Sequence, residues 1–345
     1  MRTIRITGTG SALPGRIVTN KELEQMVETS DEWIRERTGI AERHVSVGET
    51  VVTLASEAAR KALEQAGKRA EEIDLILVAT CSPEQYLPCC ACQVQADIGA
   101  VNALAFDVNA ACSGFLFALN TADAYLRMGL AENALIIGSE VLSKLVDWTD
   151  RGSCILFGDG AGAVVVERCK AESRAVEEKQ IPAAGILGRA LHSDGTGGGV
   201  LQCDARELTT PYARTSAVKT DQNQPMDDRE HFIQMDGQEV YRFATRRVPQ
   251  CIEEALSDAG LTVPDIDLFV LHQANARIID AVAKRLHADR KKFPTNLERV
   301  GNLSSASIPV LLDELNRKGK LHRGDRIVLA GFGAGLTIGA CVMTW

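Results

Sequence analysis

The chain has 345 residues, of which 45% are hydrophobic, and a formal net charge of −8 at pH 7. This length fits two ordinary domains or one large α/β unit with a sizeable core, and the charge excludes the overall basic footprint typical of a nucleic-acid-binding protein. No apolar run reaches the length of a membrane span, and the N-terminal stretch Met1–Ile6 lacks the apolar region of a signal peptide. We therefore expect a globular cytoplasmic protein that binds neither nucleic acid nor membrane.

Glycine-rich stretches occur at Gly8–Gly10 and Gly195–Gly199. The first lacks the third glycine of a dinucleotide-binding fingerprint, and Pro14-Gly15 makes a turn soon afterwards. The second lacks the lysine and the following helix of a phosphate-binding loop, so it is interpreted as a flexible turn. Neither stretch indicates a nucleotide cofactor.

A helix, a glycine stop and a buried strand occur twice along the chain. Residues 62–67 and 73–78 form the first copy, and residues 255–260 and 266–271 repeat it with the same spacing. The pattern predicts two related α/β halves, residues 1–168 and 169–345. In such a duplication, strand ends from both halves can meet at one site.

The ten cysteines show no regular disulfide spacing, which favours a reducing compartment. Cys89, Cys90 and Cys92 contain a single CxxC pair, but neither a second pair nor two histidines complete a tetrahedral metal site. We expect no metal, and we interpret the cluster as small residues at the start of a helix after Pro88.

Cys112 lies where a predicted strand, Ala103–Asn109, passes into a predicted helix that begins at Ser113-Gly114. Free cysteines usually pack as small hydrophobic residues, so packing is the alternative. A helix start, however, offers unpaired N–H groups and the positive end of a dipole, which stabilise a thiolate and a neighbouring oxyanion. The position therefore favours a reactive thiol.

The segment of about 169–234 is predicted to be irregular. Residues 170–179 and 219–229 are runs of charge that we interpret as solvated faces or loops.

Two further polar residues follow in the second half. His272 comes directly after the apolar run Leu268–Leu271, a predicted buried strand, and Asn302 precedes a Ser-rich stretch that leads into a predicted helix over 308–318. Taken singly, the first fits a hydrogen-bonded histidine and the second a turn or cap residue. Together with Cys112 they can attack an acyl carbonyl, move a proton and hold negative charge on oxygen.

Motifs along nearly the whole chain resemble β-ketoacyl-acyl carrier protein synthase III. They are Thr29–Ile34, Arg37–Ile40, Asp107–Phe115, Gly158–Ala163, His272–Asn275, Gly301-Asn302 with Ser305–Pro309, and Gly331–Gly335. The resemblance implies the thiolase fold, an α/β architecture of five layers, α-β-α-β-α, built from a duplicated half, and a homodimer.

The resemblance also implies a reaction in two steps. An acyl-CoA acylates Cys112, and malonyl-acyl carrier protein then undergoes decarboxylative Claisen condensation to give the 3-ketoacyl-carrier product that initiates type II fatty acid synthesis. His272 and Asn302 would stabilise the enolate, and the N–H groups of Cys112 and Ala334 would form the oxyanion hole. Family members usually carry glycine where Ala334 stands.

Binding roles are implied for three further groups of residues. The CoA-binding group is Trp33, Arg37, Arg151, Met235, Gly237, Gln238 and Asn275, with Gln238 in place of an expected asparagine. The acyl-pocket group is Leu87, Leu142, Phe157 and Phe332, with Leu87 contributed across the dimer. The group expected to contact the acidic carrier protein is Arg277, Lys284 and Arg285, whose spacing places them on one helix face. No cofactor beyond the CoA thioester and the carrier-bound substrate is implied.

Other functions are also compatible with parts of the pattern. A related thiolase-superfamily enzyme of secondary metabolism could make a polyketide or quinolone, use a CoA-bound extender, or transfer the acyl group to an alcohol or amine. A papain-like hydrolase shares the order Cys, His, Asn, but its nucleophile needs a Cys-Gly-x-Cys-Trp context that Cys112 lacks. The intact trio disfavours a non-catalytic homologue.

Overall fold

Two sheets form the centre of the protein in a computed structural model, which describes residues 2–170, 173–176, 179–182, 185–205 and 231–345. The first sheet has the order β1 (Arg2–Ala12), β7 (Gly160–Lys170), β6 (Asn133–Glu140), β4 (Leu75–Ala79) and β5 (Leu104–Val108). The second has the order β10 (Gly185–Ser193), β15 (Thr337–Thr344), β14 (Arg326–Gly333) and β13 (Leu268–Leu271).

Strand directions repeat between the two sheets. In the first, β4 runs parallel to β6, which is antiparallel to β7, which in turn is antiparallel to β1. In the second, β13 runs parallel to β14, and β15 and β10 follow with the same antiparallel directions. The two sheets thus agree with the repeat in the sequence, while the division at residue 168 stays a prediction.

Ten α-helices are found in the described part of the chain. They are α1 (Asn20–Leu23), α2 (Asp31–Thr38), α3 (Val51–Ala66), α4 (Cys90–Ile98), α5 (Gly114–Met128), α6 (Arg151–Cys154), α7 (Gly237–Ala259), α8 (Ala276–Arg285), α9 (Leu297–Val300) and α10 (Ser307–Arg317). The shorter 3-10 turns that matter for the site are η2 (Ala111–Ser113), η4 (Gly195–Val200) and η8 (Ser304–Ala306).

The repeated helix ends in α3 and α7 have the same local cause. Each helix stops at a glycine in the left-handed conformation, Gly67 at φ 65° and Gly260 at φ 65°. This conformation strains residues that carry a Cβ atom, so glycine is the favoured stop. At its start, α7 is capped by Asp236, whose carboxylate accepts hydrogen bonds from two backbone N–H groups.

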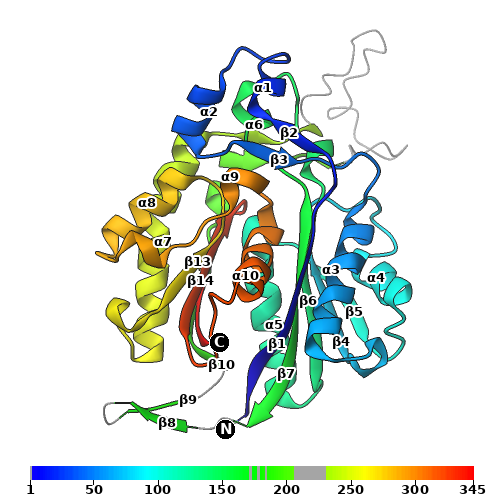
Figure 1. The fold of residues 1–345 in the computed structure, drawn as a ribbon, viewed down its shortest axis with the longest axis vertical. Helices are drawn as coiled ribbons and strands as arrows, with labels where there is room; N and C mark the ends of the chain where they lie inside the picture. Colours follow the sequence, from blue (N-terminus) through cyan, green and yellow to red (C-terminus); the bar gives the residue numbers. More distant parts are fainter. Residues whose placement is uncertain (1, 171–172, 177–178, 183–184, 206–230) are drawn as a thin grey trace.

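The layers follow the predicted order α-β-α-β-α (Figure 1). Helices α3 and α4 cover the outer face of the first sheet, α5 and α10 lie between the two sheets, and α7 and α8 cover the outer face of the second. The expected five-layer α/β fold is confirmed.

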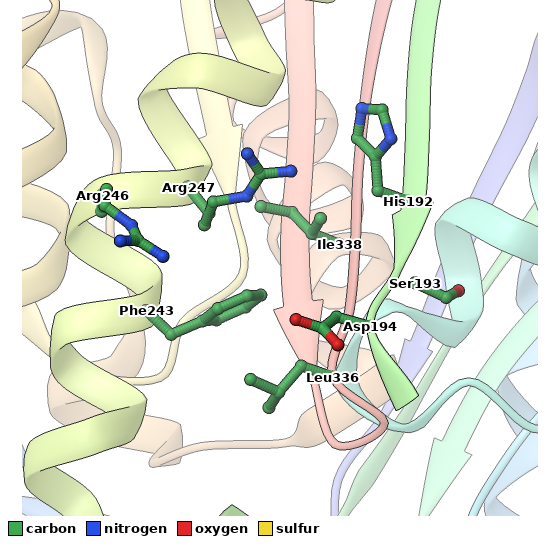
Figure 2. A pocket seen from close by; sticks show the side chains of 8 residues that line it. All are labelled: His192, Ser193, Asp194, Phe243, Arg246, Arg247, Leu336 and Ile338. Carbon is green, nitrogen blue, oxygen red and sulfur yellow. The ribbon is translucent and has the colours of Figure 1, made fainter. Parts of the chain in front are cut away.

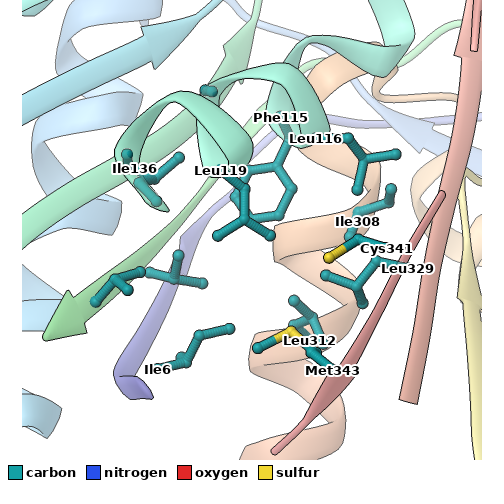
Figure 3. Packing of buried hydrophobic residues seen from close by; sticks show 14 of the residues in the cluster. Ile6, Phe115, Leu116, Leu119, Ile136, Ile308, Leu312, Leu329, Cys341 and Met343 are labelled. Carbon is teal, nitrogen blue, oxygen red and sulfur yellow. The ribbon is translucent and has the colours of Figure 1, made fainter. Parts of the chain in front are cut away.

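The middle layer packs against both sheets at once. Leu116 and Leu119 of α5 and Ile308 of α10 meet Ile136 from the first sheet and Leu329 from the second in one buried cluster (Figure 3). All five side chains are at most 1% exposed. Burying each of them contributes about 1.5–3 kcal/mol relative to exposure, so the middle helices hold the two sheets in a fixed relation.

The segment between the halves is more ordered than the sequence predicted. Part of it, including the charge run at 219–229, lies outside the described residues. In the run at 170–179, Ser173–Val176 forms the strand β8, which pairs with the antiparallel strand β9 (Lys179–Pro182). Of the two structures expected for the run, a solvated face or a loop, the loop is therefore wrong for these residues.

Residues 185–193 of the same segment form β10, a strand of the second sheet. The expected flexible turn at Gly195–Gly199 is instead η4, and it begins where the Asp194 side chain accepts the N–H of Thr196. Pairing with β15 and this cap decide the structure, and neither is visible in local composition. Short strands β11 (Leu201–Gln202) and β12 (Gln234–Met235) pair with each other, and β2 (Ile17–Thr19) pairs with β3 (Glu42–His44).

None of the described helices combines the length and the apolar character needed to cross a bilayer.

Candidate functional site

Cys112 is presented by a strained turn at the end of β5. The Asn109 side chain accepts the N–H of Ala111, and Ala111 has φ 46°, which is uncommon for a residue other than glycine. Cys112 lies in η2, which ends at Ser113, directly before the first residue of α5. The predicted strand, turn and helix start are all confirmed at this position.

The opposite side of the same turn is closed by the end of β14. A Cβ atom added to Gly333 would come within 2.6 Å of the Cys112 backbone nitrogen. Glycine is therefore required for this close approach. Thr337 ties the two segments together, because its hydroxyl donates to the carbonyl oxygens of Ala110 and Ala334.

The thiol of Cys112 is 9% exposed, and burial raises its pKa to about 12. A hydrogen bond from Ser304 lowers this pKa, and the nearby charge of Glu140 raises it. Burial therefore opposes the stabilisation of a thiolate that the helix start offers, and the reactive role of Cys112 stays a prediction. Low polarity around the sulfur favours the neutral thiol, so the proton must be removed when the acyl donor is bound.

This raised pKa predicts the pH dependence of alkylation by iodoacetamide. Below its pKa, a thiol gains thiolate about tenfold with each pH unit, so the rate constant at Cys112 is expected to rise from pH 7 to pH 10 without levelling off. Mass spectrometry of the Cys112 peptide measures this rate, with glutathione in the same tube as a thiol of ordinary pKa. A plateau at Cys112 below pH 9 would contradict the prediction.

His272 follows β13 and extends its parallel pairing, because its N–H donates to the carbonyl of Ala330 at 2.8 Å. The ring is 3% exposed, lies edge-on to Phe332 with centroids 5.5 Å apart, and has no described hydrogen-bond partner at its buried Nδ1. Burial lowers the pKa of His272 to about 3. The imidazole is thus neutral at physiological pH, which suits a group that accepts or donates a hydrogen bond to substrate.

Asn302 is held by its backbone on both sides. Its N–H donates to Leu156 at 2.9 Å, and its carbonyl accepts the N–H of Gly158 at 3.0 Å. The side-chain Oδ1 accepts the N–H of Ser304 at 2.8 Å, and the residue is 6% exposed. Since a backbone N–H needs an acceptor, this contact identifies the amide oxygen and leaves the Nδ2 amino group for substrate.

Cys112, His272 and Asn302 line one cavity of about 1210 Å³. The sequence had placed the first residue in one half of the chain and the other two in the second half. The structure brings all three together.

The same cavity includes most of the residues assigned to CoA. The members of that group that line it are Trp33, Arg37, Met235, Gly237, Gln238 and Asn275. Asn275 also caps α8, where its Oδ1 accepts the N–H of Arg277, and its Nδ2 donates to the carbonyl of Arg37. Asn275 thus caps α8 and also lines the cavity.

Arg151 lies against the indole ring of Trp33. The guanidinium carbon is 4.9 Å from the centroid of the indole, while that of Arg37 is 5.9 Å away. Arg151 also donates to the carbonyl of Glu28 at 3.0 Å. A flat base can therefore enter between Arg151 and Trp33 only if Arg151 moves.

A smaller cavity of about 220 Å³ extends from Cys112. Leu142, Phe157 and Ala334 line it, while their roles in an acyl pocket and an oxyanion hole stay predictions. Phe332 instead lines the larger cavity, beside His272. Leu87 is 86% exposed and does not line either cavity in this chain, so its assignment depends entirely on a second copy.

The three cations assigned to the carrier protein are exposed on α8. Arg277, Lys284 and Arg285 point away from the buried side of the helix, which is formed by Ile278 and Val282 among others. The guanidinium of Arg277 lies 5.6 Å from the ring centroid of Tyr241, at the edge of the large cavity. The prediction that the three cations share one exposed face of the helix is confirmed, while binding of the carrier protein to that face stays a prediction.

A third cavity, of about 250 Å³, lies between α7 and the edge of the second sheet and includes none of the predicted site residues (Figure 2). Arg246 and Arg247 of α7 face Asp194 across an apolar floor that includes Phe243 and Leu336. At its rim His192 pairs with Glu254. The charges of both signs balance one another, so this cavity does not favour an anionic ligand.

Sequence reasoning missed the buried polar residues behind the trio. Glu140 is fully buried and accepts hydrogen bonds from Ser304 and Ser305. Its position in the apolar strand β6 was the available signal, because an unpaired carboxylate is rarely buried without a specific cause.

Comparison with known proteins gives matches over the whole chain. Family models described as 3-oxoacyl-[acyl-carrier-protein] synthase III and its C-terminal part match residues 106–195 and 256–345. The β-ketoacyl-[acyl-carrier-protein] synthase III of Clostridium acetobutylicum is 46% identical over 345 residues, which is 100% of this chain and 99% of that protein.

Two solved structures have the same fold. The 3-oxoacyl-[acyl-carrier-protein] synthase III of Aquifex aeolicus gives a TM-score of 0.87 at 39% identity, over 99% of this chain and 100% of the other. The priming β-ketosynthase of the R1128 polyketide pathway gives 0.86 at 35% identity, over 99% and 96%. Together with the site geometry, these likenesses show that the chain belongs to the β-ketoacyl-[acyl-carrier-protein] synthase III family of condensing enzymes.

Proposed function

We propose that this enzyme transfers an acyl group from CoA to Cys112 and condenses it with malonyl-acyl carrier protein, giving the 3-ketoacyl-carrier product that initiates fatty acid synthesis. The observation that carries the proposal is the single cavity that joins Cys112, His272 and Asn302 to the residues assigned to CoA. We place the reaction in the cytoplasm, in keeping with cysteines that form no disulfide in the described part of the chain.

In the first step the Cys112 sulfur attacks the thioester carbonyl. Burial raises the pKa of this thiol to about 12 and lowers that of His272 to about 3, so the imidazole does not hold the proton as a separate imidazolium. Instead, His272 passes the proton from the Cys112 thiol to the leaving CoA sulfur while the Cys112 sulfur attacks. The proton leaves with CoA as its free thiol. The N–H groups of Cys112 and Ala334 would hold the oxyanion.

In the second step the malonyl group loses CO₂ and leaves an enolate. The Asn302 Nδ2 amino group is one donor that would stabilise its oxygen, since Asn302 Oδ1 faces the protein. The His272 Nε2–H would be the second, after the ring proton has moved from Nδ1, which faces the protein, to Nε2 by exchange with water in the cavity. The carbanion attacks the acyl-Cys112 carbonyl, and the Cys112 sulfur leaves as a thiolate. One proton from water restores the thiol.

A second candidate is the priming of a polyketide, and the likeness to the R1128 priming β-ketosynthase favours it. The chemistry at Cys112 is the same in both cases. The two functions differ in the starter acyl group and in the carrier protein that receives it.

Intact-protein mass spectrometry with short, branched and medium acyl-CoAs tests the proposal. We expect an acyl adduct at Cys112, and its loss with release of CO₂ when malonyl-acyl carrier protein is added. The chain-length profile identifies the starter. No adduct from any acyl-CoA, or an adduct that malonyl-CoA removes as fast as malonyl-carrier does, would overturn the proposed pair of substrates.

Carrier docking is assigned to Arg277, Lys284 and Arg285. We expect the double change Lys284→Glu and Arg285→Glu to raise the KM for malonyl-acyl carrier protein by about tenfold or more, because like charges then face the acidic carrier. Acylation by acyl-CoA should be unchanged. The control, Lys318→Glu with Lys320→Glu, makes the same charge change at the end of α10. Equal effects of the two double variants on the carrier KM would disprove the docking face.

We further propose a homodimer through the free edge of the first sheet. Strand β5 is the edge strand, and Leu104 on it is 54% exposed, close in sequence to Val101 at 73%. Exposed apolar residues beside an unpaired strand edge favour pairing with a second copy. Such a dimer would also bring Leu87 of one copy toward the acyl pocket of the other.

Replacing Leu104 with arginine is expected to produce monomers, because two buried charges would meet at the interface. Sedimentation velocity measures the change, and Met128→Arg, at an exposed apolar residue at the end of α5, is the control. A wild-type chain that sediments as a monomer would disprove the dimer.

A further inference from the structure

Glu140, the last residue of β6, is 0% exposed and lies behind the site. The Cys81 thiol lies 3.5 Å from both oxygens of the Glu140 carboxylate, which also accepts hydrogen bonds from five N–H and O–H groups. They are Thr80 Oγ1 at 3.2 Å, the Cys81 N–H at 3.1 Å and Ser82 Oγ at 2.6 Å on Oε2, and Ser304 Oγ at 3.1 Å and Ser305 Oγ at 2.8 Å on Oε1.

Burial of this carboxylate is costly, and no lysine or arginine in the described ranges forms an ion pair with it. Hydrogen bonds compensate for the missing cation. The donors belong to the segment after β4 in one half of the chain and to η8 in the other. Glu140 thus fastens to the first sheet the segment that carries Asn302.

Ser304 connects this network to the proposed chemistry. Its hydroxyl donates to Glu140, and its backbone N–H donates to Asn302 Oδ1 at 2.8 Å. Ser304 has φ 49°, a conformation that a residue with a Cβ atom rarely adopts unless its surroundings impose it. The hydrogen bond from the Ser304 hydroxyl to Glu140 keeps the Ser304 backbone N–H directed toward Asn302 Oδ1.

We propose that Glu140 is a positioning residue for the condensation step, which acts through Ser304 to orient the Asn302 carboxamide so that its Nδ2 amino group faces the enolate oxygen. The proposal rests on the function proposed above. Glu140 itself does not touch substrate, and its contribution is made through the direction of one hydrogen bond.

A second effect of the same carboxylate separates this role from a purely structural one. Three effects act on the pKa of the Cys112 thiol. Burial, the largest, raises this pKa, a hydrogen bond from Ser304 lowers it, and the charge of Glu140 raises it. Removing the charge is therefore expected to make Cys112 more reactive toward alkylation. A variant that only loosened the fold would slow both half-reactions together.

The test uses the full-length enzyme with Glu140→Gln and Ser304→Ala. Glutamine keeps the size of Glu140 and removes its charge, while alanine at 304 removes the hydroxyl and keeps the N–H. For both variants we expect condensation of the pre-acylated enzyme slower by about tenfold or more, in kcat and not in KM. Formation of the acyl-Cys112 adduct is compared for Glu140→Gln alone, because the Ser304 hydroxyl also hydrogen-bonds the Cys112 thiol, and it should be at least as fast as in wild type. Glu140→Gln should also be alkylated faster at Cys112.

Ser305→Ala is the matched control. The Ser305 hydroxyl lies 2.8 Å from Glu140 Oε1 and 2.8 Å from the carbonyl oxygen of Ala79, and it has no described contact with Asn302. Equal losses of condensation in Ser304→Ala and Ser305→Ala, or equal losses of both half-reactions in Glu140→Gln, would overturn the proposal. If the proposed function were wrong, the wild-type enzyme would lack acylation or condensation. This outcome differs from a failure of the role of Glu140 alone, in which the wild-type enzyme carries out both half-reactions.

Discussion

Replacement of Cys112 by alanine is expected to abolish the acyl adduct and to reduce condensation by about 10⁴-fold or more. The reason is that the sulfur forms the covalent bond on which both steps depend. The surrounding turn does not need the thiol, since Ala111 and Gly333 set its shape and alanine fits the buried space left by the sulfur. Intact mass after incubation with acyl-CoA, and product formation from malonyl-carrier, measure the two effects.

Cys92→Ser is the control for this prediction, because Cys92 is exposed on α4 and away from the cavities described above. It should acylate at the wild-type rate. Acylation of the Cys112→Ala protein, with the adduct found at another residue, would show that the nucleophile had been misidentified.

Changes at His272 and Asn302 are expected to separate the two half-reactions. Asn302→Ala should lower condensation by about 10²–10³-fold, the usual cost of one oxyanion donor, while the adduct still forms. His272→Ala should slow both steps, because the buried Cys112 thiol, whose pKa is raised to about 12, needs a base for acylation. Single-turnover measurements of CoA release and of product formation distinguish these outcomes.

The pH dependence of condensation follows from the state of His272. Burial lowers its pKa to about 3, so the ring stays neutral until the pH falls toward that value. Condensation by the pre-acylated enzyme is therefore expected to show no loss from His272 protonation between pH 8 and pH 5. The variants His287→Ala and Asn316→Ala are the controls for His272→Ala and Asn302→Ala, because they remove a histidine and an asparagine at other positions of the chain. A loss of activity with an apparent pKa near 6.5 that disappears in His272→Ala would contradict the neutral, buried imidazole.

Local sequence was sufficient for the elements that carry the trio. The apolar run before His272 and the helix start after Cys112 appear in the structure as β13 and α5. Hydrophobic periodicity, caps and glycine stops act over a few residues, so these elements can be identified without knowledge of the fold. The internal repeat extended this reasoning to two sheets with the same strand directions.

The middle segment was different, because pairing partners distant in sequence decide its structure. Strand β10 exists through its pairing with β15, more than a hundred residues later, and the charged residues of β8 and β9 carry no strand pattern that would distinguish them from a loop.

The sequence by itself determined the residue types of the site, their order along the chain, and the resemblance that led to the family. Only the tertiary structure decided their electrostatic states. Burial makes Cys112 a neutral thiol and His272 a neutral ring, although the helix start next to Cys112 had suggested a thiolate. Burial and the contacts of Glu140 with Ser304 arise from packing between segments far apart in the sequence, which no local pattern records.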